Sequence, residues 1–138
     1  MHIQSDPSVK KKPLIAMHGL LGSKTNLKGI CNMPGIKDKR DVYLVEMRNH
    51  AHSDHHKEHT YALLADDVIR FADQQQIDRF DVLGHSMGGR TACEMVARYP
   101  DRVDGCISID AAPVDETNNP HFGSFVQSVV SLENHPLA

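Results

Sequence analysis

The stretch that decides the fold is Phe80-Asp81-Val82-Leu83-Gly84-His85-Ser86-Met87-Gly88-Gly89. Its apolar first half, residues 80–83, predicts a buried strand, and residues 88–99 have the apolar spacing of a helix that ends before Pro100. Ser86 therefore stands on a sharp turn between a strand and a helix, with a glycine two positions to either side. Small residues there let the strand and the helix approach closely. This is the G-x-S-x-G pattern in the structural setting that gives it meaning.

Further apolar runs on both sides predict the remaining strands, at residues 13–17, 41–46 and 103–109. Nearly continuous apolar runs, rather than strictly alternating ones, favour a parallel sheet that is covered on both faces. Helical spacing in residues 61–76 and in residues 25–31 supplies connections between the strands. This alternation predicts an α/β fold with an open, mostly parallel sheet and flanking helices.

Length and composition indicate one folded domain and argue against several classes of protein. The chain has 138 residues, 40% of them apolar, and a formal net charge of −3, which fits one folded domain. The mildly acidic balance leaves no basic excess for nucleic acid, and no stretch reaches the roughly 18 apolar residues of a membrane span. The three cysteines argue against a disulfide framework and favour a reducing compartment. We expect Cys93 and Cys106 to be small core residues.

The residues around Ser86 suggest a nucleophile beside an oxyanion hole. The Ser86 hydroxyl would point outward at the carboxyl edge of the sheet, where open α/β folds bind ligands. The backbone N–H of Met87, in the first turn of the helix, is placed to donate to an oxyanion. We expect a second donor, the backbone N–H of Leu20, in the turn at residues 18–23 that follows the first strand. The alternatives are a structural glycine-rich turn at Ser86 and an ordinary strand-ending turn at residues 18–23.

Histidine is unusually frequent, with 10 residues. We expect His18 to be a packed, hydrogen-bonded side chain and His85 to point into the packed sheet. Five more histidines cluster in one segment: His50, His52, His55, His56 and His59. On a helix, the pairs four residues apart in this segment would be aligned for zinc. The alternative, which we favour, is a solvated loop that happens to be rich in histidine, with no metal.

Four segments in this order resemble successive blocks of the α/β-hydrolase superfamily: LIAMHGLLGSKTNLKGI (14–30), VYLVEMRNHAHSD (42–54), YALLADDV (61–68) and FDVLGHSMGGRTACEMVARYPDRVDGCISIDAAPVD (80–115). More narrowly, they resemble the branch of alpha/beta hydrolase domain-containing protein 11 and its bacterial esterase relatives. The resemblance implies a serine hydrolase that acts on small carboxylic ester or acyl-lipid substrates, without a metal or organic cofactor. It also implies a mitochondrial location, whereas residues 1–12 do not resemble a presequence and favour the cytoplasm, so we expect an intracellular protein, mitochondrial or cytoplasmic.

The resemblance assigns roles residue by residue. It makes Ser86 the nucleophile, Met87 and Leu20 the oxyanion hole, and Asp110 a candidate triad acid. Asp110 ends the strand after the nucleophile helix, in the segment Ile109-Asp110-Ala111-Ala112-Pro113. The alternative for Asp110 is a cap or turn residue before the proline.

Full members of this superfamily have roughly 250 residues and carry the catalytic histidine after the last strand. We therefore expect a truncated domain, with residues 1–12 poorly structured or an edge strand, 13–112 the core, and 113–138 the start of the lid region. Activity is expected to be impaired, because the histidine-bearing segment, the last strands and most of the lid are missing. His121 and His135 are the substitutes to consider.

Two other classes of function stay open. The first is a non-catalytic hydrolase-like subunit or binding module that needs a protein partner to complete its sheet, because the last strand would leave an open edge. The second is a metal-binding regulator that uses the histidine-rich segment.

Overall fold

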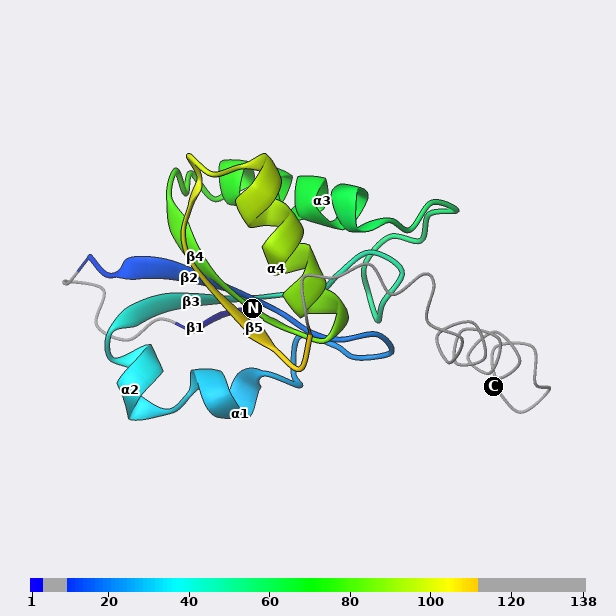
Figure 1. The fold of residues 1–138 in the computed structure, drawn as a ribbon. Coiled ribbons are helices and arrows are strands. Elements are labelled where there is room, and N and C mark those ends of the chain that lie inside the picture. The colour runs from blue at the N-terminus through cyan, green and yellow to red at the C-terminus, as the bar shows by residue number, and fades with distance from the viewer. Residues whose placement is uncertain (4–9, 112–138) are drawn as a thin grey trace.

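A twisted, mostly parallel sheet forms the centre of the computed structural model, which describes residues 1–3 and 10–111 (Figure 1). Its strand order is β1-β3-β2-β4-β5. Within these residues β1 alone runs antiparallel, along β3. The bounds are β1 (His2–Ile3), β2 (Lys12–Met17), β3 (Arg40–Val45), β4 (Phe80–His85) and β5 (Val103–Ile109). The predicted open α/β sheet is confirmed.

Helices lie on both faces of this sheet (Figure 1). The short helices α1 (Lys28–Cys31) and α2 (Pro34–Lys37) are on one face, and the longer α3 (Tyr61–Gln74) and α4 (Met87–Arg98) are on the other. Successive residues of the central strand β2 divide between two apolar cores. Ile15 lies in the core beneath α3 and α4, whereas Leu14 lies in the core beside α1. Burial on both faces explains why β2 is apolar along most of its length.

The end of the first helical region differs from the prediction. The expected helix at residues 25–31 is reduced to the single turn α1, and a second short helix, α2, begins at Pro34. A proline is tolerated at this position because the first N–H groups of a helix have no partner within the helix. Residues 112–138, which include the expected lid segment, lie outside the described residues.

The outer strand β5 is more exposed than expected. Cys106 is exposed and Cys93 is partly exposed, so the prediction that both are core residues is wrong. The reason is their position: Cys106 lies on β5, which is the last strand of the described sheet and has a neighbour on one side only, and Cys93 lies on α4, which packs on β5. Its apolar residue Ile107 is 55% exposed.

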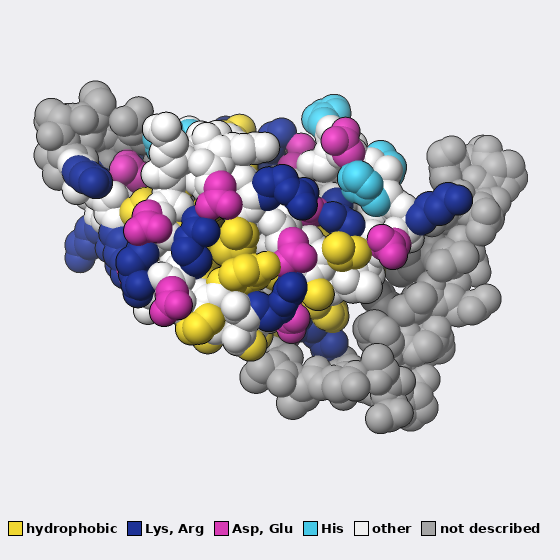
Figure 2. Space-filling view, turned by 90° about the horizontal axis from the view of Figure 1, so that it is seen from above, with side chains coloured by type: hydrophobic (Ala, Val, Ile, Leu, Met, Phe, Trp, Pro, Cys, Tyr) yellow, Lys and Arg dark blue, Asp and Glu magenta, His cyan; other side chains and the backbone are white. Residues whose placement is uncertain are grey.

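Charges of both signs are interleaved on the surface formed by α3 and α4, as Figure 2 shows. Several of them pair between elements: Arg98 Nη1 lies 2.7 Å from Asp66 Oδ1, and Arg102 Nη2 lies 2.6 Å from Asp73 Oδ1. These pairs connect α3 to α4 and to the turn after it. In the part of the chain that the structure describes, no helix is long and apolar enough to cross a bilayer.

Candidate active site

Ser86 occupies a strained turn between β4 and α4. Its backbone has φ 52° and ψ −114°, a conformation that residues with a side chain rarely adopt and that needs support from its surroundings. The support comes from glycine packing. A Cβ on Gly84 would lie 2.1 Å from the carbonyl oxygen of Gly88, and a Cβ on Gly88 would lie 2.3 Å from the carbonyl oxygen of Met17. Only glycine fits at either position, so the helix starts directly against the strands.

The turn at residues 18–23 packs against the same point. A Cβ on Gly19 would lie 3.0 Å from Nδ1 of His85 and 3.3 Å from Cβ of Ser86. The N–H of Gly22 closes the turn by donating to the carbonyl oxygen of Gly19 at 3.0 Å. Leu20, the residue after Gly19, is 39% exposed, whereas Met87 is buried at the start of α4. The two segments expected to supply oxyanion donors therefore meet at Ser86.

The side chain of His18 holds the turn at residues 18–23 in place. Its side chain is 1% exposed, its Nδ1 lies 2.8 Å from the carbonyl oxygen of Gly19, and its Nε2 lies 3.1 Å from the backbone nitrogen of Met47. The Met47 N–H must donate to Nε2, so the ring proton is on Nδ1 and donates to Gly19. Burial lowers the pKa of His18, in agreement with a neutral ring. The expected packed, hydrogen-bonded histidine is confirmed.

Asp110 follows the last residue of β5 and has φ 53°. The Ser86 N–H donates to the carbonyl oxygen of Ile109 at 2.9 Å, which fixes the end of β5 beside the turn at Ser86. The Asp110 side chain is 86% exposed, and its Oδ2 lies 3.9 Å from Nε2 of His85. The structure therefore brings Asp110 to the same edge of the sheet as Ser86.

His85 does not point into the packed sheet, contrary to expectation. Its side chain is 44% exposed and lies between Gly19 and Asp110. The reason is that β4 ends at this residue, so the ring extends past the covered part of the sheet. Sequence reasoning missed this neighbourhood, because the contacts of His85 come from the segments that follow β2 and β5.

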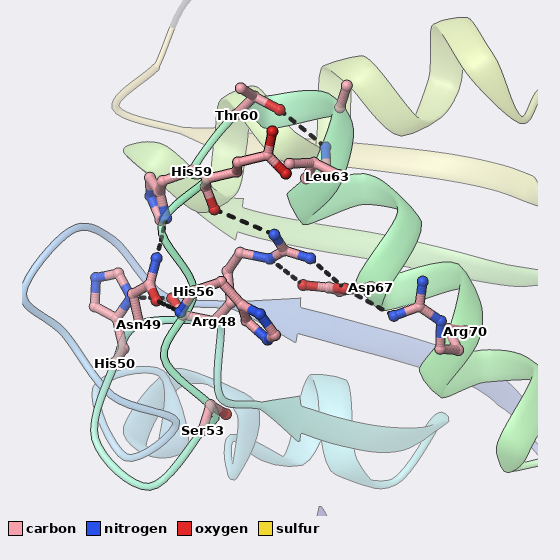
Figure 3. Close-up of polar contacts among 12 residues, drawn as sticks. Arg48, Asn49, His50, Ser53, His56, His59, Thr60, Leu63, Asp67 and Arg70 are labelled. Atoms are coloured by element: carbon pink, nitrogen blue, oxygen red, sulfur yellow. Dashed lines mark hydrogen bonds and ion pairs between the residues drawn. The ribbon is translucent and has the colours of Figure 1, made fainter.

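The loop that joins β3 to α3, residues 46–60, is held by a set of polar contacts (Figure 3). Arg48 donates to both carboxylate oxygens of Asp67 on α3, at 2.5 and 2.8 Å, and to the carbonyl oxygen of Glu58 at 3.2 Å. Asn49 links two parts of the loop, since its Oδ1 accepts from the His56 N–H at 2.6 Å and its Nδ2 donates to Nδ1 of His59 at 3.2 Å. A forked Arg–carboxylate pair gives both strength and a fixed orientation. The loop is therefore positioned by α3.

The histidine-rich segment lies in this loop and forms no helix. The spacing of four residues therefore does not align His52 with His56 or His55 with His59, and the helical zinc arrangement is wrong. Among residues 1–3 and 10–111, no three His, Cys, Asp or Glu side chains converge on a metal position. His50 is instead buried and contacts His18 edge to face, with ring centroids 5.0 Å apart.

A cavity of about 260 Å³ lies where β3 meets α3, and Ser86 does not line it. One wall carries the ion pair between Lys24 and Glu46, with Nζ and Oε2 2.8 Å apart. Burial opposes the ionisation of Glu46, but the ammonium and the backbone N–H of Lys24 outweigh this effect and hold its pKa below the ordinary value. The ion pair thus joins the segment after β2 to the end of β3.

A serine nucleophile needs a general base, and the described residues do not place one beside Ser86. Within residues 1–3 and 10–111, no imidazole hydrogen-bonds to the Ser86 hydroxyl. His121 and His135 lie outside the described residues.

A family model described as the alpha/beta hydrolase fold matches residues 12–136. With a parallel sheet, a strained serine between strand and helix and two loops packed on it, this match shows that the chain belongs to the α/β-hydrolase fold family.

Among its relatives are an sn-1-specific diacylglycerol lipase ABHD11 from Xenopus laevis, 37% identical over 95% of this chain and 43% of the relative, and a probable alcohol acetyltransferase from Saccharomyces cerevisiae, 32% identical over 94% of this chain and 39% of the relative. A solved structure named marine microorganism esterase superposes with a TM-score of 0.80 at 36% identity, over 92% of this chain and 48% of that one. The chain therefore spans less than half the length of these relatives.

Proposed function

We propose that this chain supplies the nucleophile, the oxyanion hole and the acid of a serine hydrolase that acts on carboxylic esters or acyl lipids. The observation that carries the proposal is the strained backbone of Ser86, which we interpret as a nucleophile elbow. Strain of 1–3 kcal/mol, the approximate cost of such a conformation, persists where function requires it. The names of the relatives, a diacylglycerol lipase, an esterase and an alcohol acetyltransferase, favour the same substrate class.

In this mechanism the Ser86 Oγ attacks the carbonyl carbon of the ester while its proton passes to the general base, which later gives it to the leaving alcohol. The electrons of the carbonyl double bond move onto the carbonyl oxygen. The backbone N–H groups of Met87 and Leu20 donate hydrogen bonds to that oxyanion. The tetrahedral intermediate then collapses, expels the alcohol with a proton and leaves an acyl group on Ser86. Attack by water on this acyl-serine releases the acid and restores the hydroxyl.

Asp110 is the acid in this proposal, and the base must come from outside the described residues. The backbone contact of Ser86 with Ile109 supports the role of Asp110, because it fixes the end of β5 at the site. A serine hydroxyl without a base ionises poorly near neutral pH and is a weak nucleophile. We therefore propose that this chain by itself reacts slowly and turns over poorly, through the residual effect of the oxyanion hole.

A fluorophosphonate ester probe tests this function, because it forms a stable bond to an activated serine. We expect slow, stoichiometric labelling at Ser86, located by peptide mass spectrometry and abolished in Ser86→Ala. Ser53→Ala is the matched control, since the Ser53 hydroxyl donates to the backbone carbonyl oxygen of Glu46 in the loop after β3 and is not part of the proposed machinery. Labelling that persists in Ser86→Ala, or a folded chain that is never labelled, overturns the proposal.

The exposed edge of β5 favours a second candidate, a hydrolase-like subunit whose sheet is completed by a protein partner. In the part of the chain that the structure describes, the outer edge of β5 has no neighbouring strand and its residue Ile107 is exposed, and such an edge can pair with a strand of another chain. Native mass spectrometry of the chain purified from its source distinguishes the two. A stable complex with no Ser86-dependent labelling favours the subunit. An intracellular location, cytoplasmic or mitochondrial, is part of both proposals.

A further inference from the structure

Two thiols meet where α4 packs on β5. Cys93 is on α4 and Cys106 is on β5, and both are free cysteines in the structure. The helix and the strand are in direct contact and run in opposite directions, as expected when a helix joins two parallel strands (Figure 1). Cys106 is exposed and Cys93 is partly exposed, so small molecules have access to the pair.

The register of helix and strand places the two cysteines opposite each other. A Cβ on Gly89 would lie 2.6 Å from the Ser108 hydroxyl oxygen, so these residues face each other. One turn along α4, about 5.4 Å, is Cys93, on the same side of the helix as Gly89. Two residues back along β5, about 6.6 Å, is Cys106, on the same face as Ser108.

The side chains agree with this register, because Cys93 is one of the groups that act on the Cys106 thiol. Burial, reinforced by Cys93, raises the pKa of Cys106. Cys106 is therefore mostly a neutral thiol at neutral pH, and it becomes more reactive as the solution is made alkaline. Cys31, in contrast, is 0% exposed and lies on α1, on the other face of the sheet.

We propose that Cys93 and Cys106 form a reversible oxidation site, which a small-molecule disulfide such as glutathione disulfide converts into one intramolecular disulfide. The Cys106 thiolate attacks one sulfur of glutathione disulfide, which breaks the S–S bond and releases one glutathione thiolate. The Cys93 thiolate then attacks the Cys106 sulfur of the mixed disulfide and expels the second glutathione. Two protein thiols lose two electrons and two protons, and glutathione disulfide gains them.

This crosslink would join the helix that begins at Met87 to the strand that ends before Asp110. It closes the segment between Cys93 and Cys106, which restricts the unfolded chain and raises the unfolding temperature. The inference depends on the packing of α4 and β5 alone and is independent of the proposed hydrolase activity.

The test is to treat the full chain with glutathione disulfide at mildly alkaline pH, block remaining thiols and digest with trypsin without reduction. We expect peptide 91–98 linked to peptide 103–138, with the mass of two hydrogen atoms lost, and separation of the two by reductant. In Cys93→Ser we expect glutathione to stay attached to Cys106, because the displacing thiol is gone. Cys31→Ala is the matched control and should form the link normally.

Protection of buried Cys31 from alkylation, measured in the same digests, shows that the unchanged chain and Cys93→Ser are folded, and circular dichroism shows the same for Cys31→Ala. Equal amounts of the glutathione adduct in the unchanged chain and in Cys93→Ser, or a link to Cys31 in the folded chain, would overturn the proposal. So would the absence of a link when Cys106 of the folded chain is readily alkylated.

Discussion

The imidazole of His18 cannot bind a second proton without losing one of its two hydrogen bonds. Its Nδ1–H is used by the carbonyl oxygen of Gly19, and its Nε2 accepts from the N–H of Met47. Protonation at Nε2 would set two N–H groups against each other in a buried place. The residue therefore connects the turn at residues 18–23 to the loop after β3 only while it is neutral.

We expect the free energy of unfolding to fall as the pH drops below about 6.5, the ordinary histidine pKa. Burial lowers the pKa of His18 in the folded chain, so between the folded and the unfolded pKa the unfolded chain binds a proton and the folded chain does not. Unfolding is then favoured by acid. Partial desolvation likewise lowers the pKa of His59, although this side chain is exposed, and adds an effect of the same sign.

Urea denaturation at a series of pH values between about 7.5 and 5 measures this dependence. His18→Gln, which cannot titrate, should show a flatter dependence, even if it is less stable at every pH. An equally steep dependence in His18→Gln would contradict the assignment to His18.

At the scale of elements, the contact between β4 and α4 is set by backbone atoms. Gly84→Ala would place a Cβ 2.1 Å from the carbonyl oxygen of Gly88, where no flexible side chain can move aside. We expect Gly84→Ala to lower the free energy of unfolding by about 1–3 kcal/mol or more, the typical cost of overpacking, and to weaken labelling of Ser86. Equilibrium denaturation and the fluorophosphonate probe measure the two effects.

Gly29→Ala is the control for this substitution. Gly29 lies in α1, and a Cβ there would have no atom within 4 Å. Alanine in a helix is favoured over glycine by up to about 1 kcal/mol. The control should be neutral or slightly stabilising, and equal losses in the two variants would refute the packing argument.

The elements that sequence predicts well are those with a strong local pattern. β2, β4 and β5 follow apolar runs, and α3 and α4 follow long apolar stripes. The helix α2 could not be predicted, because a four-residue segment that contains Pro34 and Gly35 has no helical pattern. This helix is stabilised by tertiary packing, because its residue Ile36 packs against the apolar core beside α1.

The candidate site likewise has local features that the sequence reveals and long-range contacts that it does not. The turn at Ser86 is local, and Gly84 and Gly88 reveal it in the sequence. The direction of the His85 ring depends on contacts with Gly19 and Asp110, which lie just after the ends of β2 and β5 and are distant in the sequence. The histidine-rich segment has helical spacing by coincidence, because the bonds of Arg48 and Asn49 determine its backbone instead.

At the scale of the molecule, the two edges of the described sheet differ. The edge at β1 is a two-residue antiparallel strand, and the Met1 ammonium group next to it donates to the carbonyl oxygen of Leu44 at 2.8 Å. The edge at β5 is seven residues long and exposes Ile107. Long exposed edges with apolar side chains promote association, whereas short ones do not.

We therefore expect concentration-dependent association through β5. Ile107→Lys should weaken it at least about tenfold, or roughly 1.4 kcal/mol, because a charged edge residue opposes strand pairing. Sedimentation velocity measures the change. Val96→Lys is the control, since Val96 is also exposed but lies on α4. The same loss of association in both variants would place the contact elsewhere.

The central position of β2 also has a consequence for synthesis on the ribosome. Leu14 in β2 pairs on one side with Val42 in β3 and on the other with Asp81 in β4. The ribosome adds roughly 5–20 residues per second, so several seconds pass between the emergence of β2 and that of β4. During that time one side of the most apolar strand has no neighbour. Nascent chains that stall before residue 85 should therefore be the form most in need of chaperones.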